Sequence, residues 1–557
     1  MSCFFKRSLF LSKVVALLVF QANASAAMPS SNEPHPNWSF REVGLIPIQS
    51  GGRIKPLDSF ARELVLTETG ARSFQSWQPL DLIFSWLTSP VAWEGRAFLQ
   101  IQREDVRRQL LMDEKRSRFS PKEIFHDSAL LQYVDAASAP VPPGTKLSAR
   151  DQELRHLLER LGIYRSIVSG EAWSVIPVPL PKPWLLLSGK EEVGQKIRES
   201  FAHLFLSYRI GDREAFEQAA LATRLAVEGQ IKNWDEGQSR KIRVEAFYNQ
   251  VRPFLLAWVL YLIAALLWLL AFQKTALGFT FSGVLVHVLG IAARCYVSGR
   301  PPVSNMYESM IWVMLGILIF ALILYFFTRR GVLLTVACSL ATLGLVIADA
   351  SPTIMDSAIH PLVPVLRSNY WLTIHVLTIT LSYAAFALAF GLGNIALFQY
   401  FKQGWGGVST QVNDAQSAVG LNQLAYRAMQ FGVVLLAAGT ILGGVWADYS
   451  WGRFWGWDPK EVWALIALLG YLIVLHARFT GWIGQFGFSV CSVLSFLSVV
   501  MAWYGVNFVL GQGLHSYGFS SGGQGWVGLF VGLQIAYVGG VAALRSSSLV
   551  KKNSIVK

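Results

Sequence analysis

The sequence predicts an all-α polytopic membrane protein, with about nine transmembrane helices after a signal peptide and a mainly helical exported N-terminal domain. Apolar residues make up 53% of the 557, charged residues only 15%, and the mean hydropathy is +0.40. That composition is typical of a membrane protein with one soluble portion. Counted along the chain, 28 of the 35 acidic residues precede residue 251, so the soluble portion comes first.

The N-terminus has the parts of a secretory signal. Two basic residues precede an apolar stretch, and a small-residue cleavage site follows it, at Lys6, Arg7 and Ala24 to Ala26. An uncleaved anchor is the alternative. We therefore expect a signal at 1–27, an exported soluble domain at 28–250, a transmembrane domain at 251–545 and a cytoplasmic tail at 546–557. Near the start of the soluble domain, a Gly-Gly turn precedes a helix that we expect Asp58 or Ser59 to cap.

Apolar runs near the ~20 residues that a bilayer requires predict the membrane spans. They lie at about 254–273, 278–294, 306–327, 331–348, 370–400, 428–446, 461–478, 486–510 and 526–544. With the soluble domain outside, the inner ends and loops carry ten basic residues against Asp414 alone, whereas the outer side has six of each sign. Because basic residues gather on the cytoplasmic side, we expect a multi-pass protein of the bacterial cytoplasmic (inner) membrane with its N-terminal domain outside, on the periplasmic side.

The net charge and the cysteines exclude several classes of protein. The charge of +13 comes partly from residues that flank spans, and no basic repeat indicates a nucleic-acid partner. The four cysteines form no CxxC and no CxxCH motif. The chain is therefore neither a thiol oxidoreductase of the usual kind nor a covalent c-type cytochrome.

Tryptophans are concentrated in one outer connection, which reads "WGRFWGWDPKEVW" from Trp451 to Trp463. A thin aromatic belt is the simplest interpretation of tryptophans at a membrane interface, but belts spread over many helices. Asp458 at the N-cap, Pro459 at N1 and Glu461 at N3 predict a capping box. We define the tryptophan loop as residues 446–463. Because it ends on a fixed helix, it can present its rings as a rigid platform, which suits a large, flat, apolar ligand.

Histidines indicate which ligand this is. His375, near the outer end of the fifth span, and His515, in the outer loop after the eighth, share the side of the tryptophan loop. Two such imidazoles would hold a haem by both axial positions, although a single interfacial histidine is more often structural. His476 lies near the inner end of the seventh span. An ionisable side chain there is a candidate functional residue, and the alternative is that it extends to the polar membrane interface. His287 and His360 are expected to be structural.

These residues resemble the CcsA family, also called ResC, the haem-handling subunit of the System II cytochrome c synthase. The stretch "WADYSWGRFWGWDPKEVWALIALLGYLIVLHAR" is closely similar to the family signature, and "GRPPVSNMYES" and "SNYWLTIHV" are similar to two further family segments. The resemblance covers about residues 254–545. Haem handlers of another maturation system share the tryptophan-rich loop (the WWD domain), but "DPKEVWAL" favours the synthase. "GGRIKPLDSFAR" is similar to the middle region of fused synthases, where a ResB-like half precedes the CcsA half.

The resemblance implies a function and a set of haem-binding residues. His375 and His515 match the external iron ligands, and His476 matches the histidine of a transmembrane haem site, whose second ligand lies on the ResB-like half. Because this chain lacks the N-terminal spans of that half, we expect a separate ResB-like subunit to supply that ligand. The implied cargo is haem b, held transiently and without a covalent bond, and the implied reaction joins haem vinyl groups to the CxxCH thiols of apocytochrome c. No residue is assigned to catalysis. The candidate haem-binding residues are His375, His515, His476, Trp446, Trp451, Trp455, Trp457, Asp458 and Trp463.

Two other functions stay open at this point. One is a haem exporter or chaperone without synthase chemistry. The other is an electron-transfer cytochrome that keeps a haem between two histidines, which would usually pair them across facing helices. Arg453 and Lys460 either pair with haem propionates or are solvated loop charges.

Overall fold

The computed structural model describes residues 33–125, 148–179, 182–230, 236–352, 354–362, 369–405, 412–510 and 522–555. The chain divides into two compact units. The N-terminal unit consists of Met1–Ile48 and Ser73–Trp234, and the bundle unit consists of Gln49–Arg72 and Asp235–Lys557. The expected signal at 1–27 and the candidate ligand His515 lie outside the described residues. The expected boundaries of the exported domain stay a prediction.

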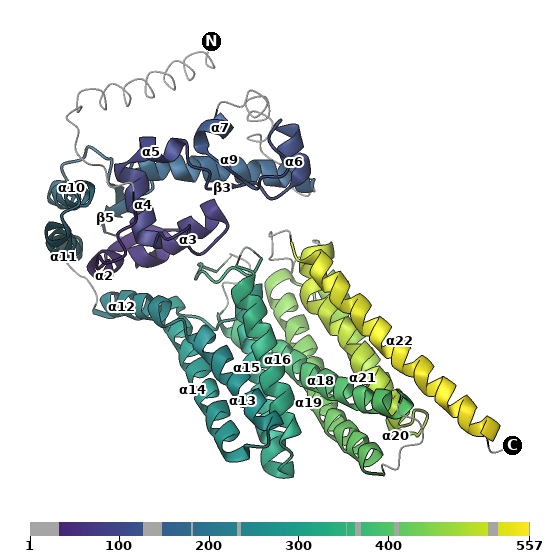
Figure 1. The fold of residues 1–557 in the computed structure, drawn as a ribbon. Coiled ribbons are helices and arrows are strands. Elements are labelled where there is room, and N and C mark those ends of the chain that lie inside the picture. Colours follow the sequence, from purple (N-terminus) through teal and green to yellow (C-terminus); the bar gives the residue numbers. More distant parts are fainter. Residues whose placement is uncertain are drawn as a thin grey trace. The chain divides into compact units, whose positions relative to one another are not determined.

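The N-terminal unit is mainly helical, with short two-stranded sheets between the helices (Figure 1). Its described elements are α2 (Arg41–Gly44), α4 (Pro79–Thr88), α5 (Pro90–Glu94), β3 (Leu99–Gln100), α6 (Glu104–Gln109), β4 (Arg118–Phe119), α7 (Pro121–Phe125), α9 (Ala149–Val168), β5 (Ser174–Ile176), β6 (Leu185–Leu186), α10 (Gln195–Ile210) and α11 (Arg213–Gln230). Strand β1 (Pro47–Ser50) leads into the bundle unit.

Aromatic rings fill the core of the N-terminal unit. Trp86 stacks on Phe98 with ring centroids 5.1 Å apart, and Trp93 meets Phe98 edge-on at 5.7 Å. The buried carboxylate of Asp81 accepts a hydrogen bond of 2.6 Å from the hydroxyl of Tyr208, so its charge is partly satisfied inside the core. This unit therefore has a hydrophobic core of its own.

The bundle unit holds the membrane-spanning helices. Its elements are β2 (Arg53–Pro56), α3 (Leu57–Thr69), α12 (Glu236–Val251), α13 (Pro253–Leu269), α14 (Gln273–Ser298), α15 (Met306–Thr328), α16 (Val332–Ala350), α17 (Asn369–Trp371), η2 (Leu372–Val376), α18 (Leu377–Trp405), α19 (Val412–Trp451), α20 (Pro459–Phe479), α21 (Gln485–Val500), η3 (Met501–Leu510) and α22 (Gln524–Ile555). Within the described chain, nine helices are long and apolar enough to cross a membrane. The predicted all-α fold with about nine spans is confirmed, and the protein is a multi-pass membrane protein, whereas the signal peptide and the export of the N-terminal domain stay predictions.

Small residues allow the helices of the bundle to pack closely. The buried face of α14 contains Gly283 and Gly290, which lie seven residues apart and face α13. A Cβ at Gly283 would lie 2.5 Å from the ring of Tyr261, and one at Gly290 would lie 2.9 Å from Pro253. Since lipid gives no hydrophobic driving force between helices, this close van der Waals contact is what holds the pair together.

A short segment from early in the chain belongs to the bundle unit. Strand β2 and helix α3 pack on α12, where Ser59 donates a 2.6 Å hydrogen bond to Glu245 and Asn249 donates one of 2.9 Å to Asp58. Helix α3 begins after Pro56 with no side-chain cap. The expectation that Asp58 or Ser59 caps this helix is therefore wrong, because both side chains bind α12 instead.

We predict that Gly283→Val lowers the thermal unfolding temperature of the detergent-purified protein. The added atoms overlap the buried Tyr261 ring, and overpacking of this kind costs about 1–3 kcal/mol. Gly278→Val is the matched control, because it lies on the same helix and a Cβ there meets nothing within 4 Å. Equal unfolding temperatures for the two variants would contradict the close packing of α13 against α14.

Candidate functional site

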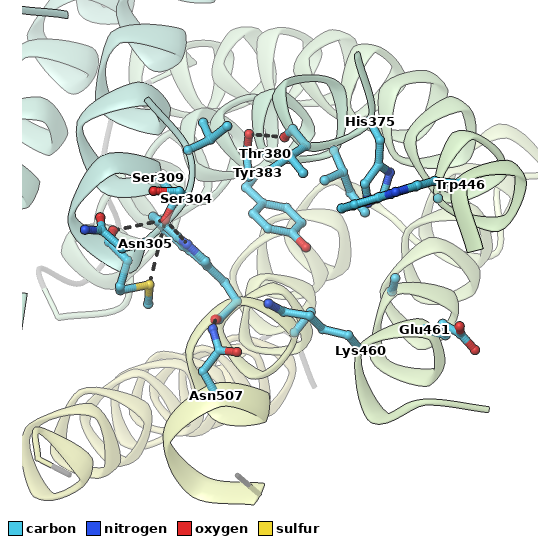
Figure 2. A pocket seen from close by; sticks show the side chains of 18 of the residues that line it. Ser304, Asn305, Ser309, His375, Thr380, Tyr383, Trp446, Lys460, Glu461 and Asn507 are labelled. Atoms are coloured by element: carbon cyan, nitrogen blue, oxygen red, sulfur yellow. Dashed lines mark hydrogen bonds between the residues drawn. The ribbon is translucent and has the colours of Figure 1, made fainter. Parts of the chain in front are cut away.

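A cavity of about 450 Å³ opens where several helices of the bundle begin or end (Figure 2). Its walls come from α15, η2, α18, α19, α20 and η3, together with the connections before α15, after α16 and between α19 and α20. This volume lies in the range of about 300–1,000 Å³ that small-molecule and cofactor sites occupy. The lining is mainly apolar and aromatic, with a few polar side chains among the rings.

Irregular helix turns border this cavity. Both π-helical segments of the described chain, η2 and η3, contribute lining residues, among them His375 in η2 and Trp503 and Asn507 in η3. A π-turn inserts an extra residue and re-aims the side chains around it, and such turns are frequent at functional sites. In a membrane protein, irregular backbone at this depth is tolerated where it lines a cavity.

His375 is held by the backbone of the neighbouring helix. Its Nδ1 lies 2.8 Å from the carbonyl oxygen of Gly439 on α19, and a carbonyl only accepts, so Nδ1 carries the proton. In the neutral ring the lone pair therefore sits on Nε2. This is the arrangement of most metal-binding histidines, in which a hydrogen bond from the other nitrogen fixes the tautomer and the ring orientation.

Glycines on α19 make room for the rings. A Cβ at Gly443 would lie 2.6 Å from Cε1 of His375, and a Cβ at Gly444 would lie 2.6 Å from the ring of Phe454. Only residues without a side chain fit these two positions. The imidazole therefore lies directly against the helix, with its centroid 5.7 Å from that of Trp446 (Figure 2).

The predicted tryptophans take different places around the site. Trp446, which is 2% exposed, and Trp455 line the cavity. Trp451 stacks on Trp446, with centroids 6.5 Å apart and planes 24° apart. Trp457 meets Trp455 edge-on at 6.0 Å, and Trp463 is half-buried on α20 outside the cavity lining.

Trp457 and Phe454 expose aromatic surface in the same loop. Trp457 is 71% exposed and Phe454 is 50% exposed. The backbone of Trp457 has a φ of +56°, a left-handed conformation that is unusual for a bulky residue and costs about 1–3 kcal/mol. Strain of this kind persists where the position of a side chain matters and clusters at binding sites.

Asp458 starts helix α20. Its side chain accepts a 3.0 Å hydrogen bond from the amide of Lys460, and the Glu461 carboxylate accepts from the amide of Asp458 at 3.1 Å. The predicted capping box is confirmed. Glu461 also accepts from the amide of Gly456 at 2.8 Å, so the loop and the helix are joined by hydrogen bonds.

Polar groups reach the cavity from α20 and η3. Lys460 extends into the space between Tyr383 and Asn507, whereas Glu461 points away (Figure 2). The Nδ2 of Asn507 donates to the carbonyl of Trp503 at 3.1 Å, and its buried Oδ1 has no hydrogen-bond partner among the described residues. The cavity thus combines apolar walls with a cation and an unsatisfied polar atom, as a site for an amphipathic ligand requires.

His476 does not join this cavity. It lies sixteen residues after Lys460 on α20, which corresponds to a rise of about 24 Å along the helix at 1.5 Å per residue. Its side chain is exposed, and its Nδ1 donates to the carbonyl of Leu472 at 2.7 Å. The same tautomer as in His375 is therefore held at the other end of the bundle.

His287, which the sequence predicts to be structural, is buried, and its Nδ1 is hydrogen-bonded to the hydroxyl of Tyr261 at 3.1 Å.

Sequence reasoning missed two residues of the site, His360 and Asp356. Both line the cavity from the connection after α16 and form a hydrogen-bonded pair. An isolated histidine in a loop carries no helical or metal-ligand spacing. The only local signal was a carboxylate four residues earlier, which is too common to have singled the pair out.

Comparison with known proteins agrees with this architecture. Residues 303–515 match the family model described as cytochrome C assembly protein. The chain is 35% identical to the cytochrome c biogenesis protein CcsA of Mesostigma viride over 264 residues, which are 44% of the chain and 85% of that protein. It is 36% identical to the CcsA of Prochlorococcus marinus (strain MIT 9301) over 259 residues, 43% of the chain and 82% of that protein.

A longer relative matches both parts of the chain. The protein NrfI of Wolinella succinogenes is 30% identical over 495 residues, which are 84% of the chain and 53% of NrfI. The chain therefore spans about half the length of NrfI. The fold and cavity define a polytopic membrane protein with an aromatic-lined cavity. The chain belongs to the CcsA family of cytochrome c biogenesis proteins, whose members handle haem.

We predict that Asp458→Asn keeps the stability of the protein while Asp458→Ala lowers it by about 1 kcal/mol. Asparagine caps helices as well as aspartate does, whereas alanine leaves an amide of the first turn without its acceptor. Thermal unfolding in detergent measures both. If Asp458→Asn is as destabilised as Asp458→Ala, the negative charge rather than the cap is what the loop requires.

Proposed function

We propose that this protein receives haem and presents it in the cavity beside the tryptophan loop for thioether attachment to the CxxCH motif of apocytochrome c. The observation that carries the proposal is His375, whose ring is oriented by Gly439 at the wall of an aromatic cavity. Haem is the substrate here, and it leaves with the product.

The cavity residues fit a porphyrin. Rings of Trp446, Trp455 and Phe454 offer an apolar surface, and aromatic contacts contribute about 0.5–1.5 kcal/mol each beyond the burial of area. The Nε2 of His375 is the nitrogen suited to iron. Lys460 supplies a positive charge suited to a propionate, which favours that alternative over a solvated loop charge. When bound, the haem supplies the vinyl groups that react.

A second axial ligand is needed for a low-spin iron. By resemblance to the family, we propose His515, which lies outside the described residues. Two imidazoles would hold the iron until the histidine of the apocytochrome replaces one of them. Such a haem is bound without a covalent bond to this chain, as haem b.

The exposed rings beside the cavity suit an incoming polypeptide. Trp457 and Phe454 expose aromatic surface in the loop that also provides Trp455 to the lining. An exposed aromatic patch next to a ligand site favours an interaction with a partner. This supports the presentation of haem to apocytochrome c rather than its permanent retention.

We further propose that His476 belongs to a second, inner haem site that is completed by a ResB-like subunit. Its exposed ring and fixed tautomer suit a ligand contributed from outside the chain. In this proposal haem enters near the cytoplasmic end of α20 and moves to the outer cavity. The exported domain and the tryptophan loop then lie on the periplasmic side of the inner membrane.

The proposed function is tested first at the two proposed iron ligands of the outer site, His375 and His515. The wild-type protein, purified with its partner, should carry low-spin haem that acid acetone extracts. His375→Ala and His515→Ala should each lower the yield of holocytochrome c at least tenfold, because one axial position is empty. Added imidazole should partly restore the yield by filling that position.

His203→Ala is the control for these variants, because it removes an exposed histidine of the N-terminal unit. Wild-type yields from both His375→Ala and His515→Ala would rule out the outer haem site. Haem that apocytochrome c fails to remove from the protein would favour the electron-transfer cytochrome, and haem release without thioether formation would favour the exporter or chaperone.

The second prediction concerns the path of haem. His476→Ala should deplete haem from both sites, because loading fails at the first one. His375→Ala should leave the inner site occupied while it stops attachment. Haem per complex, measured by pyridine haemochrome beside the yield of holocytochrome c, distinguishes the two blocks. Full occupancy of the outer site in His476→Ala would contradict the path and make His476 an interfacial residue.

A further inference from the structure

A second histidine faces the cavity from a loop, and it is paired with a carboxylate. The Nε2 of His360 lies 2.6 Å from Oδ2 of Asp356, and both side chains are about half exposed, at 50% and 52%. The other oxygen of Asp356 accepts from the amide of Ala358 at 2.8 Å, which holds the carboxylate in place. Both residues line the same cavity as His375.

The backbone of this loop is clamped at each residue from 356 to 360. Its five successive carbonyls accept hydrogen bonds from four side chains that come from distant parts of the chain. The donors are Asn305 to residue 356 (3.1 Å), Arg294 to 357 (2.8 Å) and 358 (3.4 Å), Arg53 to 359 (2.6 Å) and Arg300 to 360 (2.9 Å). These hydrogen bonds restrain the backbone of the loop at five successive residues.

The arginines are themselves fixed by buried carboxylates. Glu308 is 1% exposed and binds Arg294 at 2.9 Å and Arg300 at 2.8 Å, and Glu245 holds Arg53 through two hydrogen bonds of 2.7 Å. Satisfying loop carbonyls does not require charged groups, which are costly to bury. The arrangement therefore does more than close the loop, because it fixes the place of the His360–Asp356 pair.

The pair has the geometry of a general base. Because the carboxylate accepts from Nε2, the proton of the neutral imidazole lies there and the lone pair lies on Nδ1. A carboxylate that orients a histidine in this way selects the tautomer and stabilises the imidazolium formed when the ring takes a proton. The half-exposed position leaves the ring accessible to a macromolecular substrate.

We propose that His360, positioned by Asp356, is the base that takes the proton from the cysteine thiol of the incoming apocytochrome. This assignment rests on the proposed function. The thiolate is the reactive form of cysteine, so the base prepares the group that attacks the haem vinyl. His360 would be a catalytic residue and Asp356 a positioning residue.

The step balances without another reactant. The S–H bond of the cysteine breaks, and its proton passes to Nδ1 of His360. A C–S bond forms at the vinyl carbon next to the porphyrin ring, and the outer vinyl carbon takes the proton back from the imidazolium. The sum is the addition of a thiol across a double bond, with no net oxidation or reduction.

The charges around the ring suit this role. The hydrogen bond to Asp356 raises the pKa of His360 above its usual value, the charges of Asp356 and Glu63 raise it further, and burial and Lys55 oppose them. Burial raises the pKa of the Asp356 carboxyl, but the hydrogen bond and charge of His360, the amide of Ala358 and the charge of Arg294 together outweigh it, so that this pKa is lowered. A general base with a pKa near the working pH is effective.

The first test is His360→Gln in the full chain, coexpressed with a ResB-like partner. Glutamine keeps an N–H donor for Asp356 but has no basic nitrogen. We expect unchanged haem content and spectrum, and an initial rate of thioether formation on a CxxCH peptide about 100-fold lower at neutral pH, within the range for general bases. His156→Gln is the matched control, because it removes an exposed histidine paired with Glu159 in the N-terminal unit.

The second test is Asp356→Asn, which keeps an acceptor for Nε2 and removes the charge. The pKa of His360 should fall, so the acid limb of the attachment rate should move to lower pH and the plateau rate should drop. Carbethoxylation of His360 by diethyl pyrocarbonate, followed by mass spectrometry across pH, measures the same pKa in haem-free protein. It should shift to lower pH in Asp356→Asn.

The outcomes separate this proposal from the proposed function. A wild-type rate and pH profile in His360→Gln, loss of haem from that variant, or no shift of the carbethoxylation profile in Asp356→Asn would each overturn the base assignment. If haem content is normal in these variants and His375→Ala is inactive, the proposed haem site remains supported and only the assignment of His360 as a base fails. If instead His375→Ala matures cytochrome c normally, the proposed function itself fails.

Discussion

The carboxylate of Glu308 lies between the guanidinium groups of Arg294 and Arg300, and all three side chains are buried. Each charge has lost its water, and the loss is offset because Glu308 also accepts from the amide and hydroxyl of Ser304 at 2.9 and 2.8 Å. Well-packed apolar residues often give equal stability in place of such a cluster, so stability alone does not account for it. The cluster orients the two guanidinium groups. Their remaining N–H groups point to the loop after α16 and bind its carbonyls, and this loop brings Asp356 and His360 to the cavity.

The opposite wall of the cavity depends on the absence of side chains. Gly439, Gly443 and Gly444 let α18, η2 and the tryptophan loop, respectively, approach α19 so closely that a Cβ at any of them would overlap a neighbour. The π-turn at η2 then aims His375 at the backbone of α19, where a carbonyl orients its ring. Rigid charge pairs on one side and close backbone contact on the other produce a cavity whose residues are oriented before a ligand enters. Preorganisation of this kind is what a binding site for a reacting substrate requires.

His375 and His476 show the same local device at two ends of the bundle. In each, Nδ1 donates to a backbone carbonyl and leaves the lone pair on Nε2. The difference lies in the surroundings, since His375 faces an aromatic cavity and His476 an exposed helix surface. His360 is different again, because its partner is a carboxylate that makes the ring a stronger base. The three histidines thus differ in their surroundings and in the group that one ring nitrogen binds.

The sequence by itself determined the features that depend on neighbouring residues. Hydropathy located the spans because a helix that crosses the lipid needs about 20 consecutive apolar residues. The capping box at Asp458 was predictable because it depends only on two residues three positions apart. Tertiary structure decided what depends on contacts between distant segments. Only the tertiary structure shows that His375 packs against Gly443 and that Trp463 lies outside the cavity lining. It also shows that Asp58 hydrogen-bonds to Asn249 of α12 and does not cap α3. The His360–Asp356 pair was invisible for the same reason, because the arginines that hold its loop come from as far as 306 residues away, and no local pattern records a hydrogen bond across that separation.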